Sequence, residues 1–193
     1  MNTTKTVSIV FYKGSGNFRD KLIRLWTKSP YSHCEFGRSD GLYHSNDRFR
    51  LVSRAEMIDI QSNDWEICKL TLPAEIIERV EKRQLKKNGT QYDWIGIIFS
   101  QVFRLGIHDS RRWFCSKSNA DDLHYAYKLM QRSKKSTFAP YVHALHPIQK
   151  FKSNELSPSD LFAIVREIEH LQNNIHSNEV RYQEVYERSY RAG

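Results

Sequence analysis

Apolar and polar residues alternate over several short stretches in the first third of the chain, which is the pattern of strands with one buried face. The alternation predicts a first strand over residues 6–12. Three more short strands are predicted over 32–38, 42–45 and 49–53, and a further one over 64–72. Turn-forming residues separate the middle three strands by only a few positions, so we expect these strands to form an antiparallel meander.

Helical spacing of apolar residues marks the remaining stretches. It predicts helices over residues 17–29, 75–87, 93–105, 115–130 and 158–171. Asn17 and Asp20 supply an N-cap and an acidic third residue for the first of these helices, and the run from Ser157 to Asp160 caps the last one. Residues 131–137 are typical of a loop, and residues 141–151 have no readable pattern.

The order of these elements predicts an α+β fold in which helices pack on a central antiparallel sheet. A chain of 193 residues suits one domain, and at this size a domain buries about 70 % of its unfolded surface. We assign residues 1–172 to this domain. Residues 173–193 are polar and carry tyrosines at helical spacing, so we interpret them as a C-terminal tail or a marginal helix.

The chain is basic, with a formal net charge of +8, and most of the excess (+6) falls within residues 74–135. Such a region, together with exposed aromatic residues, is also typical of a non-catalytic protein that binds nucleic acid or an acidic partner. On the predicted helix over 75–87, acids come early and bases late, as the helix dipole favours. A solvated helix face explains that order, and the chain carries no nucleic-acid-binding motif. Nucleic acid is therefore not the expected partner, although the binding protein stays as an alternative.

Composition and cysteine usage give an expected location. No apolar run approaches the roughly 20 residues needed to cross a bilayer, so no transmembrane segment is expected. The N-terminal apolar stretch, residues 7–12, is short and is followed by no small-residue cleavage site, which argues against a secretory signal. The three cysteines form no CxxC pair, and an odd number of them fits a reducing compartment. We therefore expect a cytoplasmic protein.

Cys115 is the first candidate for chemistry, because it stands at the start of a predicted helix. The first backbone N–H groups of a helix have no partner within that helix, and the helix dipole favours negative charge there. Both effects lower the pKa of a thiol and favour the nucleophilic thiolate. The same amides can stabilise the oxyanion of a tetrahedral intermediate. Cys115 is therefore the candidate nucleophile.

His33 lies far upstream of Cys115, in a predicted strand. Because side chains alternate along a strand, His33 and Glu35 are expected on one face and Cys34 on the other. A histidine base oriented by Glu35 would complete the nucleophile, base and orienter of a thiol hydrolase. Side chains two residues apart on one strand only just reach each other, so His44 on the neighbouring strand stays open as an alternative orienter.

Four short motifs carry a family resemblance. They are SHCEF at Ser32–Phe36, YDW at Tyr92–Trp94, WFCS at Trp113–Ser116 and LSPSDL at Leu156–Leu161. Their order resembles the circularly permuted branch of the NlpC-type papain-like cysteine hydrolases, in which the histidine strand precedes the cysteine helix. The resemblance covers roughly residues 5–165. It implies a papain-like fold with Cys115 as nucleophile, His33 as base and Glu35 as the third catalytic residue.

The resemblance also implies a reaction, namely cleavage of an amide through a thioester on Cys115. The substrate would be a peptide, an isopeptide or a peptidoglycan-derived fragment. An acyltransferase or thioesterase stays open as an alternative, and so does a lipid-acyl hydrolase of the same fold. Family members often carry an acid two residues after the cysteine, whereas this chain has Lys117. A lysine there favours the thiolate or an anionic substrate.

The remaining candidate residues have structural interpretations. Cys34 and Cys68 lie in the middle of predicted strands among apolar neighbours and are interpreted as core residues. His143 and His146 lack the companions of a metal site, and Gly14–Gly16 completes no phosphate-binding motif. No metal and no organic cofactor is therefore expected. The expected partner is a peptide or an acyl-bearing substrate.

Overall fold

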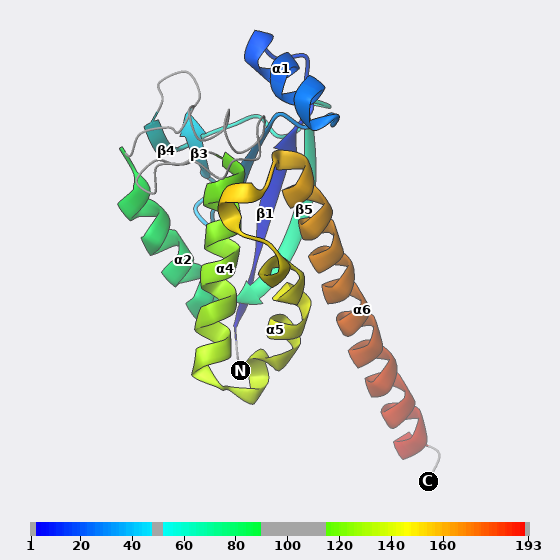
Figure 1. Ribbon diagram of the computed structural model, residues 1–193. Helices are drawn as coiled ribbons and strands as arrows, with labels where there is room; N and C mark the ends of the chain where they lie inside the picture. Colours follow the sequence, from blue (N-terminus) through cyan, green and yellow to red (C-terminus); the bar gives the residue numbers. More distant parts are fainter. Residues whose placement is uncertain (1–2, 48–51, 90–114, 192–193) are drawn as a thin grey trace.

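A five-stranded antiparallel sheet forms the centre of the molecule (Figure 1). The computed structural model describes residues 3–47, 52–89 and 115–191. The strands are β1 (Thr4–Tyr12), β2 (His33–Gly37), β3 (Tyr43–Asp47), β4 (Val52–Glu56) and β5 (Trp65–Pro73). Their spatial order is β4-β3-β2-β1-β5, and all the neighbouring strands pair in antiparallel fashion. The predicted α+β class with an antiparallel sheet is confirmed.

The predicted meander is present as β2, β3 and β4, which pair in chain order. The last of these strands is described at Val52–Glu56, so it continues beyond the predicted end at 53, while residues 49–51 of the prediction lie outside the described residues. Its position follows from its register with β3, in which Tyr43 faces Glu56 and Asp47 faces Val52. Local alternation does not specify the pairing partner, so the sequence pattern ended this strand too early.

The described residues also form five α-helices and three short 3-10 helices. The α-helices are α1 (Phe18–Thr27), α2 (Ala74–Lys87), α4 (Cys115–Ser133), α5 (Ala139–Leu145) and α6 (Pro158–Arg191), and the 3-10 helices are η2 (Ser136–Phe138), η3 (His146–Lys150) and η4 (Ser153–Glu155). Four of the five predicted helices are therefore present, and the predicted helix over 93–105 lies outside the described residues. Helix α5 was not predicted. It is short and is held by the burial of Ala144 and Leu145, so tertiary packing decides it.

Both predicted caps are confirmed. At the start of α1 the Asn17 side chain accepts the N–H of Asp20 at 3.2 Å, and the Asp20 carboxylate accepts the N–H of Asn17 at 2.8 Å. Before α6 the Asp160 N–H donates to the Ser157 hydroxyl at 3.1 Å, and the Ser157 N–H donates to the Asp160 carboxylate at 3.0 Å. Each exchange supplies hydrogen-bond acceptors for two backbone N–H groups that have no partner within the helix.

Helix α6 is much longer than predicted. The periodicity predicted an end near Leu171, but the helix continues to Arg191 through the stretch interpreted as a tail or a marginal helix. The sequence from Ser159 to Arg191 contains neither glycine nor proline, so nothing in it interrupts a helix. Figure 1 shows the distal part of α6 leaving the body of the molecule. Among the helices that the structure describes, none combines the length and the apolar composition of a bilayer span.

The core lies between the sheet and the helices that cover it. Large buried side chains of β1 and β2 include Phe11 and Phe36, and those of α4 include Leu123 and Met130. Leu161, Ile164, Val165 and Ile168 of α6 join the same cluster, as the helical spacing predicted. Burial of this apolar area is the main force that fixes α4 against β2, and this contact positions the candidate site.

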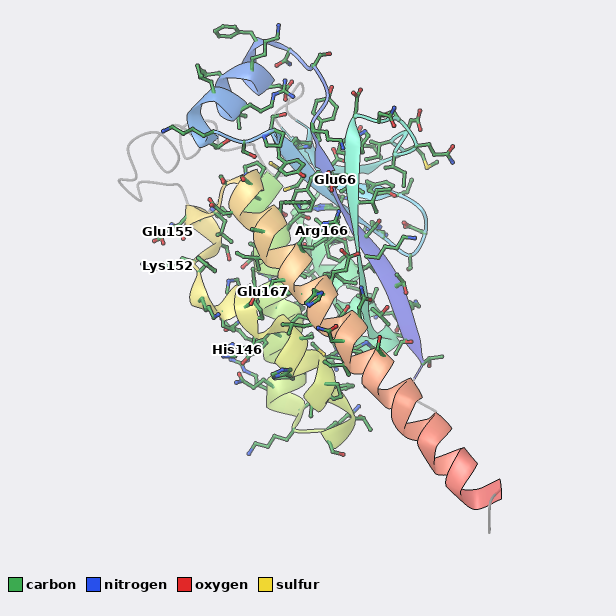
Figure 2. All side chains as sticks on the ribbon, turned by 90° about the vertical axis from the view of Figure 1, so that its right-hand side faces the viewer. Glu66, His146, Lys152, Glu155, Arg166 and Glu167 are labelled. Atoms are coloured by element: carbon green, nitrogen blue, oxygen red, sulfur yellow. The ribbon has the colours of Figure 1, made fainter. Side chains whose placement is uncertain are left out.

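Helix α6 also covers the open edge of the sheet at β5. The Thr71 N–H donates to the Gln172 side chain at 2.9 Å, and that amide returns a hydrogen bond to the Thr71 carbonyl at 2.8 Å. Figure 2 shows Arg166 of α6 directed at Glu66 of β5, and the ion pair measures 2.7 Å. An uncovered edge strand is a template for unwanted strand pairing. These contacts therefore close the edge and orient α6.

Candidate active site

Cys115 is the first residue of α4 and is buried, with 3 % of its surface exposed. It lies against the start of β2, in hydrogen-bonding contact with the side chains of His33 and Cys34. The structure therefore brings together a cysteine and a histidine that are far apart in the chain. Cys115 stands in the first turn of α4, where the positive end of the helix dipole lies.

His33 and Glu35 form a hydrogen-bonded pair on β2. The distance from His33 Nε2 to Glu35 Oε1 is 2.9 Å, and both residues are almost completely buried. The predicted contact between alternate residues of the strand is therefore present. With Nε2 engaged by the carboxylate, Nδ1 is the ring nitrogen left for Cys115. Glu35 thus fixes the ring orientation and stabilises its protonated form.

The strand register places His44, the alternative orienter, on another face of the sheet. His44 is the cross-strand partner of Phe36, so its side chain shares the face of Phe36 and not the face of His33 and Glu35. Burial and the nearby charges of Lys87 and Arg38 lower the pKa of His44 to about 4. Among the described residues, Glu35 is the carboxylate bonded to the His33 ring.

The electrostatics of the pair favour a thiolate and an imidazolium. A hydrogen bond from the Cys34 thiol and the charge on His33 lower the pKa of Cys115 well below its usual value, although burial acts in the opposite direction. Burial lowers the pKa of His33, but the Cys115 thiolate and Glu35 outweigh it and raise that pKa to about 9. These shifts favour a negative sulfur beside a positive ring at neutral pH, which is the reactive state of a thiol nucleophile.

Cys34 is a site residue that the sequence interpretation missed. Its interpretation as a core residue is correct in that it is buried, but its thiol also interacts with the Cys115 side chain. Burial and this neighbour raise the pKa of Cys34, so it stays protonated and acts as a hydrogen-bond donor. The amide of Asn119 donates to the Cys34 sulfur at 3.3 Å, to the Cys34 carbonyl at 3.2 Å and to the Cys115 carbonyl at 3.0 Å. Asn119 therefore ties the first turn of α4 to β2.

Replacing Cys34 with alanine is expected to raise the pKa of Cys115, because the thiolate loses a hydrogen-bond donor. A thiol is a weak donor, so the iodoacetamide labelling rate of Cys115 at pH 6 should fall by about twofold to tenfold, which corresponds to about 0.5–1.5 kcal/mol. The rate is measured by mass spectrometry of the Cys115 peptide. Cys68→Ala is the matched control, because Cys68 is a buried strand cysteine without this contact. An unchanged rate in Cys34→Ala would show that the thiol does not support the thiolate.

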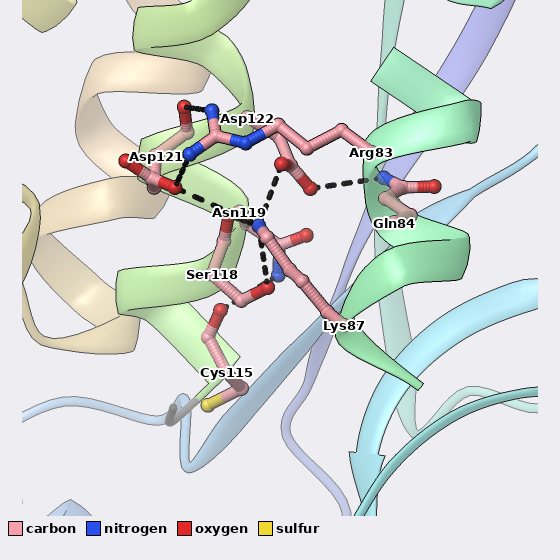
Figure 3. A network of polar contacts seen from close by, with 8 residues as sticks. All are labelled: Arg83, Gln84, Lys87, Cys115, Ser118, Asn119, Asp121 and Asp122. Atoms are coloured by element: carbon pink, nitrogen blue, oxygen red, sulfur yellow. Dashed lines mark hydrogen bonds and ion pairs between the residues drawn. The ribbon is translucent and has the colours of Figure 1, made fainter. Parts of the chain in front are cut away.

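A second polar network joins α2 to α4 next to the site. Figure 3 shows Lys87 of α2 reaching α4 one turn beyond Cys115. Its ammonium donates to Asp122 at 2.6 Å and to the Ser118 hydroxyl at 3.3 Å. The other oxygen of the Asp122 carboxylate accepts the Gln84 amide at 3.1 Å. Lys87 and Asp122 are both buried, so each charge depends on the other.

Other basic residues within 74–135 also form ion pairs with acidic side chains. Arg83 pairs with Asp121 at 2.5 Å, and Lys135 pairs with Glu75 at 2.7 Å. These contacts join α2 to α4 and to the segment after α4. Part of the positive excess in this region therefore belongs to helix packing and not to a surface for an anionic partner.

Some of the other residues singled out from the sequence lie within the described residues. Lys117 is buried in the first turns of α4, and Cys68 is buried in β5. His143 and His146 are both exposed, and within the described residues no group of three or more His, Cys, Asp or Glu side chains is arranged to hold a metal ion. The motif residues Tyr92–Trp94 and the pair Trp113–Phe114 lie outside the described residues.

Comparison with protein-family models, with curated proteins and with solved structures found no match for this chain. The site is therefore defined by its own geometry. That geometry comprises a cysteine at a helix N-terminus, a buried histidine in contact with it, and a carboxylate bonded to the histidine.

Proposed function

We propose that this protein is a cysteine hydrolase that cleaves an amide bond through a thioester on Cys115. The observation that carries the proposal is the arrangement of Cys115, His33 and Glu35. Cys115 and His33 interact so that each favours the charged form of the other, and the imidazole is held by a carboxylate at 2.9 Å. Nucleophile, base and orienter in this relation are the parts that acyl transfer requires.

The chemical steps follow from the charges of the pair. The Cys115 thiolate attacks the substrate carbonyl carbon, a C–S bond forms, and the oxyanion is stabilised by amides at the start of α4. The His33 imidazolium gives its proton to the leaving amine as the C–N bond breaks. Neutral His33 then takes a proton from water, whose oxygen attacks the thioester. The acid leaves, the thiolate returns, and His33 holds the proton once more.

The fold proposed for this activity is the permuted papain-like one. Two features support it, namely an antiparallel sheet and a histidine strand that precedes the cysteine helix in the chain. The role of Glu35 as the third residue belongs to the same proposal. A peptide, isopeptide or peptidoglycan fragment is the proposed substrate class, and a cytoplasmic location fits the three free thiols.

The test is to trap the acyl group on Cys115. The purified protein is incubated with three sets of compounds, namely peptidoglycan peptides, isopeptide-linked tails and phospholipids, and is quenched in acid. Intact-mass and peptide mass spectrometry then locate any adduct. We expect a mass increase on the Cys115 peptide with an amide-bearing compound, and none in Cys115→Ala. Cys68→Ala is the matched control and should still form the adduct.

The outcomes separate the alternatives. An adduct from phospholipid alone would replace the amide hydrolase with a lipid-acyl hydrolase. An adduct that is released only when an amine or alcohol is added would indicate an acyltransferase. If Cys115 forms no adduct and also reacts with iodoacetamide no faster at pH 6 than Cys68, the catalytic proposal is wrong.

A further inference from the structure

Helix α1 has its apolar side turned to solvent. Phe18, Leu22 and Leu25 follow one another at helical spacing and are 78 %, 42 % and 77 % exposed. Residues at this spacing form one face of a helix. In a surface helix of a globular protein that face packs on the core, so α1 has the opposite orientation.

The polar side of α1 is the side that faces the body. Asp20 is buried, and its carboxylate accepts the Ser32 hydroxyl at 2.9 Å as well as the Asn17 N–H at 2.8 Å. Gly16 precedes this cap with a φ of 54°, and a Cβ at this position would collide with the Asp20 side chain. The buried carboxylate therefore fixes which way α1 is turned.

Arg24 holds the same orientation one turn later. Its guanidinium donates to the backbone carbonyls of Lys13, Gly14 and Ser15, at 3.1 Å for Lys13 and 2.6 Å for Ser15. Rotating α1 to bury its apolar face would break these bonds and those of Asp20. The exposure of the apolar side chains is therefore built into the fold.

The exposed charges beside this face are positive. Lys21 and Lys28 are exposed, whereas the single acid of α1, Asp20, is buried and bonded. In the sequence, residues 13–28 contain five basic residues and one acidic residue. Apolar and basic side chains interleaved on one helix are the composition of helices that lie in a membrane interface.

We propose that the outer face of α1, formed by Phe18, Leu22, Leu25 and Lys21, docks on an anionic membrane surface together with Lys28, which directly follows the helix. Aliphatic and aromatic side chains enter the headgroup region, and the lysines contact anionic lipids. The centres of protein interfaces are depleted of lysine, which favours lipid over a protein partner. Figure 1 shows α1 at one end of the molecule.

This surface lies beside the candidate active site. Ser32, which is bonded to Asp20 of α1, directly precedes His33, and α1 lies at the same end of the molecule as the start of α4 (Figure 1). Docking through α1 would therefore bring Cys115 close to the membrane. The proposal does not depend on the catalytic role of Cys115, because it concerns the helix surface alone.

The test is co-sedimentation of the full chain with vesicles of phosphatidylcholine alone and of phosphatidylcholine with phosphatidylglycerol at a ratio of about 3:1. We expect binding to the anionic vesicles that weakens in high salt. Phe18→Ser with Leu25→Ser should reduce the partition coefficient by about tenfold or more, because two apolar anchors are lost. Leu85→Ser with Phe151→Ser is the matched control, since both residues are exposed apolar side chains outside α1, and it should bind like the wild type.

A charge variant and a measurement of the oligomeric state complete the test. Lys21→Glu with Lys28→Glu should abolish the preference for anionic vesicles. Equal binding by the α1 variants and the control variant would overturn the proposal. A second result would also overturn it. This result is a wild type that sediments as a dimer and becomes a monomer in Phe18→Ser with Leu25→Ser, without a change in vesicle binding. The face would then be a contact between copies of this chain.

Discussion

Replacing His33 with alanine is expected to slow the alkylation of Cys115 by iodoacetamide at pH 6 by about a hundredfold. In the wild type the Cys34 thiol and the His33 imidazolium keep the pKa of Cys115 well below its usual value, so we expect the thiolate to be the main form at this pH. Without the ring, the pKa of Cys115 rises towards that of an ordinary thiol, and a thiol of pKa about 8.5 is only about 0.3 % ionised at pH 6. A more basic thiolate is intrinsically more nucleophilic, which keeps the loss below the full ratio.

The pH dependence of labelling distinguishes this effect from a general disturbance of the site. The wild-type rate should be nearly flat between pH 6 and pH 8, because Cys115 is already ionised. In His33→Ala the rate should rise with pH, as the thiolate fraction grows by about tenfold per pH unit below the pKa. Cys68 is the internal reference, because burial raises its pKa to about 12 and it should stay unlabelled in both proteins.

The carboxylate can be tested by the same measurement. Glu35→Gln keeps the size of the side chain but removes the charge that helps to raise the pKa of His33 to about 9. The wild-type imidazolium is present below this pKa and loses its proton as the pH rises through it. The imidazolium should therefore lose its proton at a lower pH in Glu35→Gln than in the wild type, and the accompanying change in the labelling rate of Cys115 should begin at that lower pH.

The proposed ion pair would be contradicted if Cys115 were labelled at the same rate in His33→Ala and in the wild type at pH 6.

Replacing Lys87 with methionine is expected to lower the free energy of unfolding by about 3–5 kcal/mol, the cost of breaking a buried ion pair from one side. Asp122 is completely buried, and in this variant its carboxylate must keep its charge without a cation or take up a proton. The Ser118 hydroxyl also loses its ammonium partner. The change is measured by urea denaturation at pH 7.

Two further variants make this prediction specific. Lys86→Met removes an exposed lysine from the same turn of α2 and should change the free energy of unfolding by no more than about 0.5 kcal/mol. Lys87→Met with Asp122→Leu replaces both charges with apolar groups and should recover most of the loss. A decrease of less than about 1 kcal/mol in Lys87→Met alone would show that the pair does not hold α2 to α4.

The local features of this fold were readable from the sequence. Alternation located the strands, helical spacing located α1, α2, α4 and the start of α6, and both caps were identified from their residues. The same rules placed Cys115 at a helix start and put His33 and Glu35 on one face of a strand. These features depend on neighbours within a few residues, so the order of residues is enough to specify them.

The tertiary structure decided the contacts between elements. It placed the Cys34 thiol against Cys115, turned His44 towards the other face of the sheet and joined Lys87 to Asp122. It also turned the apolar face of α1 outward. Each of these contacts joins residues that are distant in the chain or depends on strand register and helix rotation. Register and rotation are set by packing over the whole domain, because many weak contacts must be satisfied together, and local sequence patterns do not contain that information.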